Sequence, residues 1–203
     1  MALMHTHAAK VFWFSGLSGA GKTTWAEYLK RYLTAQGFAV CLLDGDMLRR
    51  GLSKDLGYSL ADREENVRRA CEVAQCLVKQ GITVVAAFMT PTPACRQIIK
   101  NTFSSALVQE IYCQCSIDAC EVRDPKGFYQ RARLDNVRQV VGWDLPFIIP
   151  KNPPLVLDTE HHSMPHNQAL LRQFITRCYF YDSACESVCE VAHESIFNRL
   201  VRP

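Results

Sequence analysis

A glycine-rich segment near the start of the chain constrains the fold more than any other feature of the sequence. Residues 16–23 read Gly-Leu-Ser-Gly-Ala-Gly-Lys-Thr and match the pattern G-x-x-x-x-G-K-[ST]. An apolar run of strand length, residues 11–14, precedes this segment, and residues 22–36 place apolar side chains at helical spacing after it. A strand, a glycine turn and a helix in this order predict a P-loop, whose backbone N–H groups face the phosphates of a nucleotide.

The residue types of the P-loop predict an ATP site that works with Mg²⁺. We expect Lys22 to reach the β- and γ-phosphate oxygens and the hydroxyl of Thr23 to bind the magnesium ion. The predicted ATP-binding residues of this segment are Gly16, Leu17, Ser18, Gly19, Ala20, Gly21, Lys22, Thr23 and Thr24.

Strands alternate with helices through the rest of the chain. Apolar runs predict strands at residues 40–43, 82–88, 108–115 and 155–157, and helical spacing predicts helices from Asp62 to Gly81, at 94–102 and shortly after 115. Asp62 and Glu65 have the spacing of a capping box with Asp62 as the cap. Apolar and polar side chains do not alternate along residues 82–88, which predicts a strand that is buried on both faces of the sheet. The order of elements predicts a three-layer α/β fold, with a mainly parallel sheet between flanking helices and ligands at the carboxyl ends of the strands, as in P-loop nucleoside kinases.

Length, charge and hydropathy narrow the class of protein. The 203 residues are enough for one sizeable core, so we predict a single domain over 1–203. A formal net charge of +3 with basic residues in local clusters favours small anionic ligands over nucleic acid. No segment approaches the roughly 20 apolar residues of a membrane helix, and residues 1–10 lack the apolar core of a secretory signal. We therefore expect a cytoplasmic protein with no nucleic-acid or membrane partner.

The cysteines and histidines favour structural roles. The ten cysteines lie mostly in apolar runs without a C-x-x-C pair, which predicts reduced thiols that fill the core. Cys185 and Cys189, one helical turn apart, are the pair for which a redox role stays open. His161, His162 and His166 read as a polar loop, with a metal site as the less favoured alternative.

Two carboxylates, Asp44 and Asp46, directly follow the second strand. An acid at this place either holds Mg²⁺ or accepts the proton of an acceptor hydroxyl. We assign Asp44 to the magnesium site with Thr23 and Asp46 to catalysis with Lys22. Asp-Gly-Asp also makes good turns, so a purely capping role stays open for one of the pair, more for Asp44 than for Asp46. The third strand has no acid at its end and the chain has no Asn-Lys-x-Asp element, which disfavours a nucleotide-dependent motor or guanine-specific switch.

Basic residues of two later segments predict contacts with anions. Arg63 and Asn66, three residues apart in the first turn of a helix, suit an anion beside a polar base edge. A second group surrounds Gly127 and predicts a lid over the transferring phosphoryl group, although a surface role stays open for each arginine. The members of this group are Arg123, Lys126, Arg131 and Arg133.

Several segments jointly carry a resemblance to one kinase family. They are residues 12–23, Leu43-Asp44-Gly45-Asp46, residues 49–52, Leu56-Gly57-Tyr58-Ser59, residues 62–69, residues 123–129, Asn152-Pro153 and Leu157-Asp158-Thr159. Through them, residues 10–159 resemble the adenylyl-sulfate kinase family. Residues 160–203 are then a C-terminal extension, which we expect to form amphipathic helices packed on one face of the sheet. Its apolar positions are Leu170, Leu171, Phe174 and Cys178, then Val188, Val191, Ala192 and Ile196.

The resemblance implies transfer of the γ-phosphoryl group of ATP to the 3′-hydroxyl of adenylyl sulfate (APS), giving PAPS and ADP, in a dimeric enzyme that needs Mg²⁺. It implies that Asp46 meets the acceptor hydroxyl, that Tyr58 stacks on the APS adenine and that Arg123 lies near the ATP purine. The implied substrate-binding residues are Asp46, Arg49, Tyr58, Arg63, Asn66, Met89, Thr90, Lys126 and Val140, and Thr90 is also assigned to catalysis.

Two positions depart from the family pattern. Val140 stands where the family commonly has an aromatic residue facing the APS adenine, and Thr90 stands where it has a serine. The valine leaves open a related kinase with a different nucleotide acceptor. A non-catalytic, nucleotide-binding regulatory subunit is the alternative from another class, which the intact Lys22, Thr23 and Asp46 disfavour. Whether a sulfurylase is a partner stays open.

Overall fold

The computed structural model describes residues 8–180, whose centre is a five-stranded sheet. The strands are β1 (Val11–Ser15), β2 (Val40–Asp44), β3 (Thr83–Ala87), β4 (Val108–Gln114) and β5 (Leu155–Asp158). Their order across the sheet is β2-β3-β1-β4-β5, and every neighbouring pair is parallel. The prediction of a mainly parallel sheet is confirmed, and the P-loop strand β1 lies at its centre.

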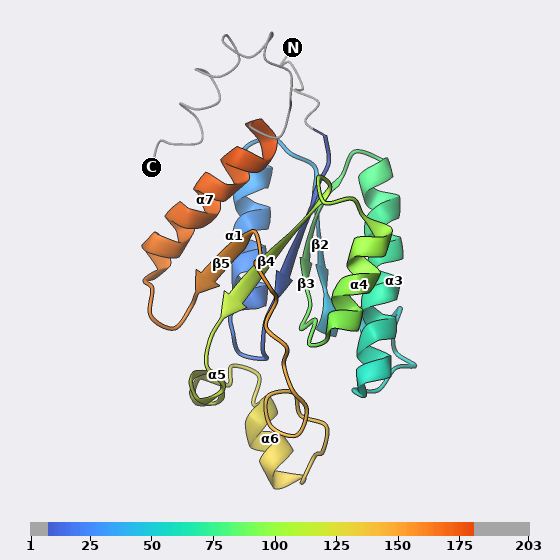
Figure 1. Cartoon of the computed structure of the whole chain (residues 1–203), viewed down its shortest axis with the longest axis vertical. Coiled ribbons are helices and arrows are strands. Elements are labelled where there is room, and N and C mark those ends of the chain that lie inside the picture. Colours follow the sequence, from blue (N-terminus) through green and yellow to red (C-terminus); the bar gives the residue numbers. More distant parts are fainter. Residues whose placement is uncertain (1–7, 181–203) are drawn as a thin grey trace.

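Helices cover both faces of this sheet, as the three-layer prediction requires. The helices of the described residues are α1 (Lys22–Ala35), α2 (Gly45–Leu48), α3 (Leu60–Lys79), α4 (Pro93–Thr102), α5 (Ile117–Arg123), α6 (Phe128–Leu134) and α7 (Met164–Phe180). Figure 1 shows α1 and α7 against one face and α3 and α4 against the other. The short helices α5 and α6 lie beyond the end of the sheet to which the strand arrows point. This end therefore holds most of the loops that follow the strands.

Two apolar clusters, one on each face of the sheet, form the core. Phe12 and Phe14 of β1 pack with the α1 and α7 side, whereas Val11 and Trp13 pack with the α3 and α4 side. Because β1 and β3 are covered on both faces, all five residues of each strand are buried. This confirms the prediction made for run 82–88.

Buried thiols contribute to both clusters, as expected from their apolar surroundings. Cys113 belongs to one cluster and Cys71 to the other. Burial raises the pKa of each of these two thiols to about 12. Both therefore stay protonated near neutral pH and behave as small apolar side chains. Cys185 and Cys189 lie outside the described residues.

The start of α3 differs from the prediction. The helix begins at Leu60, and its cap is Ser59, not Asp62. The Ser59 hydroxyl oxygen accepts from the Asp62 N–H (3.1 Å), and the Asp62 carboxylate accepts from the Ser59 backbone N–H (3.3 Å), so the capping box joins these two residues. The helix therefore starts at a hydroxyl three residues before the predicted cap, and Asn66 consequently lies in the second turn of α3.

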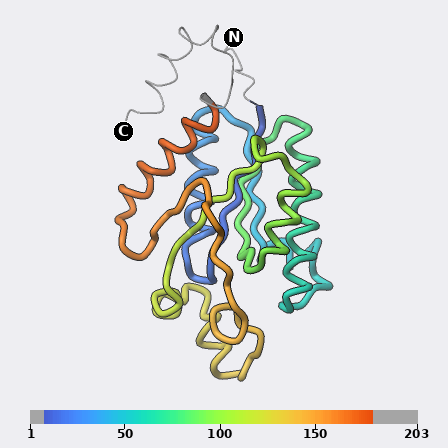
Figure 2. Tube along the Cα trace, viewed as in Figure 1, coloured from blue at the N-terminus to red at the C-terminus, as the bar shows by residue number. Residues whose placement is uncertain are grey.

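The C-terminal extension contributes helix α7 to the fold. Its apolar residues Leu171 and Ile175 are buried in the same cluster as Leu29 and Leu33 of α1, which confirms the predicted packing of this segment on one face. Figure 2 shows the chain leaving α6, turning back and rising to β5 before α7 begins. The second predicted helix, around Val188, lies outside the described residues. Among residues 8–180, no helix combines the length and apolar character needed to cross a membrane.

Candidate active site

A cavity of about 680 Å³ lies among the residues that follow strands β1, β2, β3 and β5, with further walls from α3 and from the segment after α5. This is the carboxyl edge of the sheet, where ligands were expected. The predicted site residues that line it are Ser18, Gly19, Gly21, Lys22, Thr23, Thr24, Asp44, Asp46, Arg49, Tyr58, Arg63, Asn66, Met89, Thr90, Arg123 and Lys126. The predicted residues outside its lining are Gly16, Leu17, Ala20 and Val140, together with Arg131 and Arg133 of the predicted lid.

The P-loop passes so close to the neighbouring backbone that two of its glycines have no room for a side chain. A Cβ atom on Gly16 would lie 2.6 Å from the carbonyl oxygen of Cys113, and one on Gly19 would lie 2.8 Å from that of Cys120. Gly19 also has a φ of +79°, which favours glycine. The loop is therefore pressed onto the end of β4 and onto α5, which fixes its shape.

The N-terminus of α1 faces the cavity with its N–H groups uncapped by any side chain. Gly21 is the cap residue, and no side chain accepts a hydrogen bond there. Such an N-terminus is suited to bind phosphate. Lys22 donates from Nζ to the Leu17 carbonyl oxygen (2.6 Å), and burial lowers the pKa of Lys22 although the charge of Asp46 raises it. An anionic ligand would restore the favourable environment that this ammonium group loses on burial.

Asp44 and Thr23 meet at the edge of the cavity. The Thr23 hydroxyl donates to Oδ2 of Asp44 (2.8 Å). The other oxygen, Oδ1, accepts from the backbone N–H groups of Asp46 (2.9 Å) and Met47 (3.3 Å) and caps α2. The capping role that stayed open for Asp44 is therefore present, and the same carboxylate also contacts Thr23, its partner in the predicted magnesium site.

Asp46 forms an ion pair with Lys126 of the predicted lid, across 80 positions of the chain. Lys126 Nζ lies 2.5 Å from Asp46 Oδ2. Burial acts to raise the pKa of Asp46, but the hydrogen bond and charge of Lys126, with the charges of Lys22 and Arg49, outweigh burial and lower the pKa. The carboxylate is therefore ionised at neutral pH, as a general base must be.

An aromatic ring and two guanidinium groups form the next part of the wall. The Arg49 and Arg63 guanidinium carbons lie 4.8 and 5.5 Å from the ring centroid of Tyr58. Arg63 is 8% exposed and Asn66 is 4% exposed, and Oδ1 of Asn66 has no hydrogen-bond partner among the described residues. A buried amide oxygen without a partner, in a cavity wall that also holds cationic groups, suits a ligand that carries both an anion and a hydrogen-bond donor.

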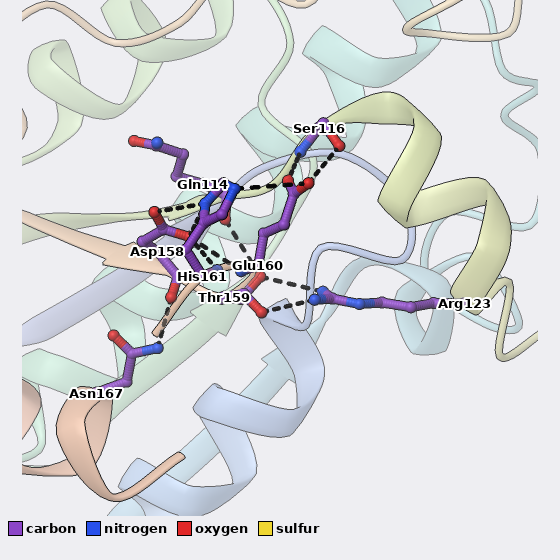
Figure 3. Close-up of polar contacts among 8 residues, drawn as sticks. All are labelled: Gln114, Ser116, Arg123, Asp158, Thr159, Glu160, His161 and Asn167. Carbon is purple, nitrogen blue, oxygen red and sulfur yellow. Dashed lines mark hydrogen bonds and ion pairs between the residues drawn. The ribbon is translucent and has the colours of Figure 1, made fainter. Parts of the chain in front are cut away.

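Arg123 and Thr159 close another part of the cavity wall. Figure 3 shows Arg123 reaching from the end of α5 to Thr159, with Nη1 and Nη2 donating to its hydroxyl (3.2 Å) and carbonyl (2.6 Å) oxygens. The Thr159 hydroxyl also donates to the carbonyl oxygen of Ala20 in the P-loop (3.2 Å). Glu160 accepts from the backbone N–H (2.7 Å) and hydroxyl (3.0 Å) of Ser116, the cap of α5. Hydrogen bonds therefore join the end of β5, the P-loop and α5.

Val140 lies in the core, and the partly buried Trp143 packs against it; both residues are outside the cavity lining. Val140 is 1% exposed and belongs to the cluster on the α1 and α7 side, so its contact with the acceptor base stays a prediction. Trp143 packs beside Tyr129, with ring centroids 5.5 Å apart, and donates its indole N–H to Glu121. An apolar side chain at position 140 gains more from burial than from a place on the cavity wall.

Three predicted polar groups have structural partners. The Thr90 hydroxyl accepts from the indole N–H of Trp13 (2.9 Å), which favours a structural role over the predicted catalytic one. Arg133 pairs with Glu121 and, like Arg131, lies outside the cavity lining. His161 Nδ1 lies 3.0 Å from Asp158 Oδ2. Within the described part of the chain, no three His, Cys, Asp or Glu side chains come together as a metal site of that kind requires.

Sequence reasoning missed several residues of the cavity wall, among them Trp25, Thr159 and Met164. Thr159 directly follows the last strand, so the rule that ligands bind at strand ends indicates it. Trp25 sits three residues after Lys22 on α1, where the sequence indicated only apolar side chains at helical spacing. Met164 begins α7, and no motif in the sequence marks it.

Comparisons with known proteins point to one family. A family model described as Adenylylsulphate kinase matches residues 8–158. The adenylyl-sulfate kinase of Bacillus licheniformis is 42% identical over 169 residues, 83% of this chain and 86% of that protein. The structure of the Mycobacterium tuberculosis APS kinase CysC in complex with AMPPNP and APS matches with a TM-score of 0.77 and 36% identity, over 83% of this chain and 98% of that chain. A hexameric APS kinase from Thiobacillus denitrificans matches with a TM-score of 0.62 and 29% identity, over 86% of this chain and 30% of that chain. The chain therefore belongs to the adenylylsulphate kinase family.

Proposed function

We propose that this chain transfers the γ-phosphoryl group of ATP to the 3′-hydroxyl of APS, giving PAPS and ADP. One observation carries the proposal: a single cavity is lined both by an intact P-loop with Lys22 and by the ionised Asp46. The relative from M. tuberculosis, at 36% identity, has a structure in complex with AMPPNP and APS, which supports two nucleotides in one such cavity.

The P-loop side of the cavity supplies the donor site. The uncapped N-terminus of α1 and Lys22 would hold the phosphates of ATP. Arg123 and Thr159, which line the cavity and are joined by hydrogen bonds, would border the purine. Because Thr159 is also bonded to the P-loop carbonyl of Ala20, the proposed purine and phosphate contacts belong to one connected framework.

The other side of the cavity supplies the acceptor site. Tyr58, with Arg49 and Arg63, would take the adenine and anionic groups of APS, and the free Oδ1 of Asn66 would accept a hydrogen bond from its base. Asp46 would accept the proton of the 3′-hydroxyl of APS. The 3′-oxygen would form the new bond to the γ-phosphorus of ATP while the bond between that phosphorus and the β-phosphate oxygen breaks. Lys126 would then leave Asp46 for the transferring phosphoryl group, since both compete for its charge.

The residues beside Asp44 fit a magnesium ion. The Thr23 hydroxyl and Asp44 Oδ2, 2.8 Å apart at the cavity edge, are oxygen donors of the kind that Mg²⁺ prefers, and one carboxylate with one hydroxyl is typical of nucleotide-bound Mg²⁺. When bound, the ion would neutralise charge on the β- and γ-phosphates. Asp44 would meanwhile keep its cap on α2 through Oδ1 and so hold the backbone of Asp46.

A steady-state assay decides between this function and its alternatives. The purified chain with Mg-ATP should turn over APS faster than a panel of other nucleotide acceptors, measured as acceptor-dependent ADP release. Efficient turnover of another nucleotide with negligible turnover of APS would favour the related-kinase alternative. Binding of ATP without turnover of any acceptor would favour the regulatory subunit.

We expect removal of Lys126 to shift the acid limb of the pH profile to higher pH. The lysine lowers the pKa of Asp46 against the opposing effect of burial, so in Lys126→Met burial acts with less opposition and the pKa rises. Because only the ionised carboxylate accepts a proton, kcat/KM for APS would begin to fall at a higher pH than in the wild type. Lys100→Met, at an exposed position of α4, is the control that should keep the wild-type profile. Unchanged acid limbs in both variants would remove Asp46 as the titrating base.

Arg63→Ala is expected to raise KM for APS more than KM for ATP. Arg63 is buried in the cavity wall beside Tyr58, whereas the P-loop comes from other elements. Losing a charge-assisted contact costs roughly 1.5–3 kcal/mol, which corresponds to about 10- to 150-fold in acceptor affinity. Arg68→Ala, on the exposed side of the same helix, should change neither constant. An equal rise in both Michaelis constants for Arg63→Ala would contradict its place on the acceptor side.

The assembly and location follow as further proposals. The family resemblance supports a homodimer, and the T. denitrificans relative, described as hexameric, indicates that larger assemblies occur among its relatives. Light scattering of the purified chain distinguishes these states. We also propose a cytoplasmic location, because the reaction consumes ATP. A sulfurylase partner stays an open question.

A further inference from the structure

The turn after β3, residues 88–91, holds an unusual backbone conformation on the cavity wall. Thr90 has a φ of +52°, in the left-handed region, and is 1% exposed. This region is unfavourable for a β-branched residue and costs on the order of 1–3 kcal/mol unless the surroundings enforce it. Thr90 lines the cavity, so the strain lies directly beside the proposed ligands.

A buried tryptophan enforces this conformation. Trp13, which is completely buried in β1, donates its indole N–H to the Thr90 hydroxyl oxygen (2.9 Å), and its ring stacks on Phe88 with centroids 4.9 Å apart. The Thr90 hydroxyl in turn donates to the Phe88 carbonyl oxygen at 3.4 Å. Without Thr90, the indole N–H would be a buried donor without its partner, which a folded protein tolerates poorly. The hydrogen bond therefore compensates for the strain at Thr90.

The turn contacts the P-loop and the acceptor side at the same time. The Met89 carbonyl oxygen accepts from the backbone N–H of Gly16 (3.2 Å), and Nη1 of Arg63 lies 3.6 Å from the Met89 sulfur. Phe88 packs against Gly45, where a Cβ atom would lie only 3.0 Å from its ring, directly before Asp46. One short turn thus lies against the P-loop, a proposed acceptor contact and the residue next to the proposed base.

We propose that the Trp13–Thr90 hydrogen bond is a positioning device, which fixes the turn 88–91 and thereby the place of the acceptor relative to the P-loop. Thr90 is accordingly a positioning residue and acts through Met89 and Phe88. The proposal rests on the proposed function only for its kinetic readout. The hydrogen bond from Gly16 to Met89 can be followed by amide exchange without any nucleotide acceptor.

Three variants separate the hydroxyl of Thr90 from its shape. Thr90→Val keeps the branched shape and removes the hydroxyl, Thr90→Ser keeps the hydroxyl, and Trp13→Phe removes the indole N–H. In Thr90→Val we expect the Gly16 amide to exchange with solvent on the order of 10-fold faster, because its acceptor Met89 is no longer held. KM for APS should rise on the order of 10-fold, while KM for ATP stays within about twofold, since the remaining P-loop is supported by other packing. Thr90→Ser should restore wild-type values, and the double variant of Trp13→Phe with Thr90→Val should be no worse than Thr90→Val alone.

Thr92→Val is the matched control for a loss of stability. Thr92 caps α4 by accepting from the Cys95 N–H (3.2 Å), so its removal lowers Tm without touching the Trp13 hydrogen bond. Wild-type exchange at Gly16 in Thr90→Val, or a fall in Tm like that of Thr92→Val with unchanged KM for APS, would overturn the proposal. If the wild-type chain does not phosphorylate APS, the proposed function fails, and the exchange of Gly16 alone then decides: acceleration in Thr90→Val with rescue in Thr90→Ser supports the inference, and no change overturns it.

Discussion

Lys22→Ala is expected to lower kcat by on the order of 10³-fold or more, because the charge that stabilises the transferring phosphoryl group is lost. The Lys22 ammonium group lies in the cavity wall beside the proposed phosphate site, where burial lowers its pKa. Bound polyphosphate would favour the charged form, so the affinity for ATP should also fall in the variant. The measurement is ADP release at saturating APS, together with ATP binding by calorimetry.

Lys30→Ala provides the control for Lys22→Ala. Lys30 is on the same helix, α1, but is exposed to solvent and lies outside the cavity lining. This variant should keep the wild-type kcat and ATP affinity. Turnover of Lys22→Ala within about tenfold of the wild type would mean that the P-loop lysine is not the main cation at the transferring group.

Asp46→Asn is expected to lower kcat by on the order of 100-fold or more while ATP binding stays close to that of the wild type. Asparagine keeps the size of the side chain but neither accepts the proton of an alcohol nor pairs by charge with Lys126. The backbone position should persist, because the cap on α2 comes from Asp44 and its bond to the N–H of residue 46 does not involve the replaced side chain. Single-turnover kinetics would place the loss in the chemical step.

Asp118→Asn is the matched control, since Asp118 is an exposed carboxylate in the first turn of α5, outside the cavity lining. We expect it to behave like the wild type in the same assay. If Asp46→Asn kept the wild-type rate at saturating acceptor, a different group would have to accept the proton. Asp46 would then serve only to hold Lys126.

The fold and much of the site could be predicted because their signals are local. The P-loop, the buried run of β3 and the acids after β2 each occupy a short segment whose pattern depends on its own residues. The start of α3 was missed because two capping signals overlap in this segment, one at Ser59 and one at Asp62. The earlier one, at Ser59, is the cap that forms. Local patterns therefore predict which elements form better than where each begins.

The remaining features depend on residues far apart in the chain. The hydrogen bond between Trp13 and Thr90 joins positions 77 residues apart, and no pattern around either residue predicts it. Val140 was assigned to the acceptor site by its position in the family pattern, whereas its apolar side chain is buried in the core. Position within a family pattern thus does not show which side chains the rest of the chain buries.

Because helix α7 packs on the core, the part of the chain that folds together extends beyond the part that matches the family model. The match stops at residue 158, yet α7 supplies Met164 to the cavity, donates from Asn167 to the Asp158 carbonyl oxygen (2.8 Å) and buries Leu171 and Ile175 against α1. A fragment cut at the end of the match would expose the apolar side of α1, the helix whose first turn is the proposed phosphate site. A minimal catalytic fragment of this chain must therefore retain α7.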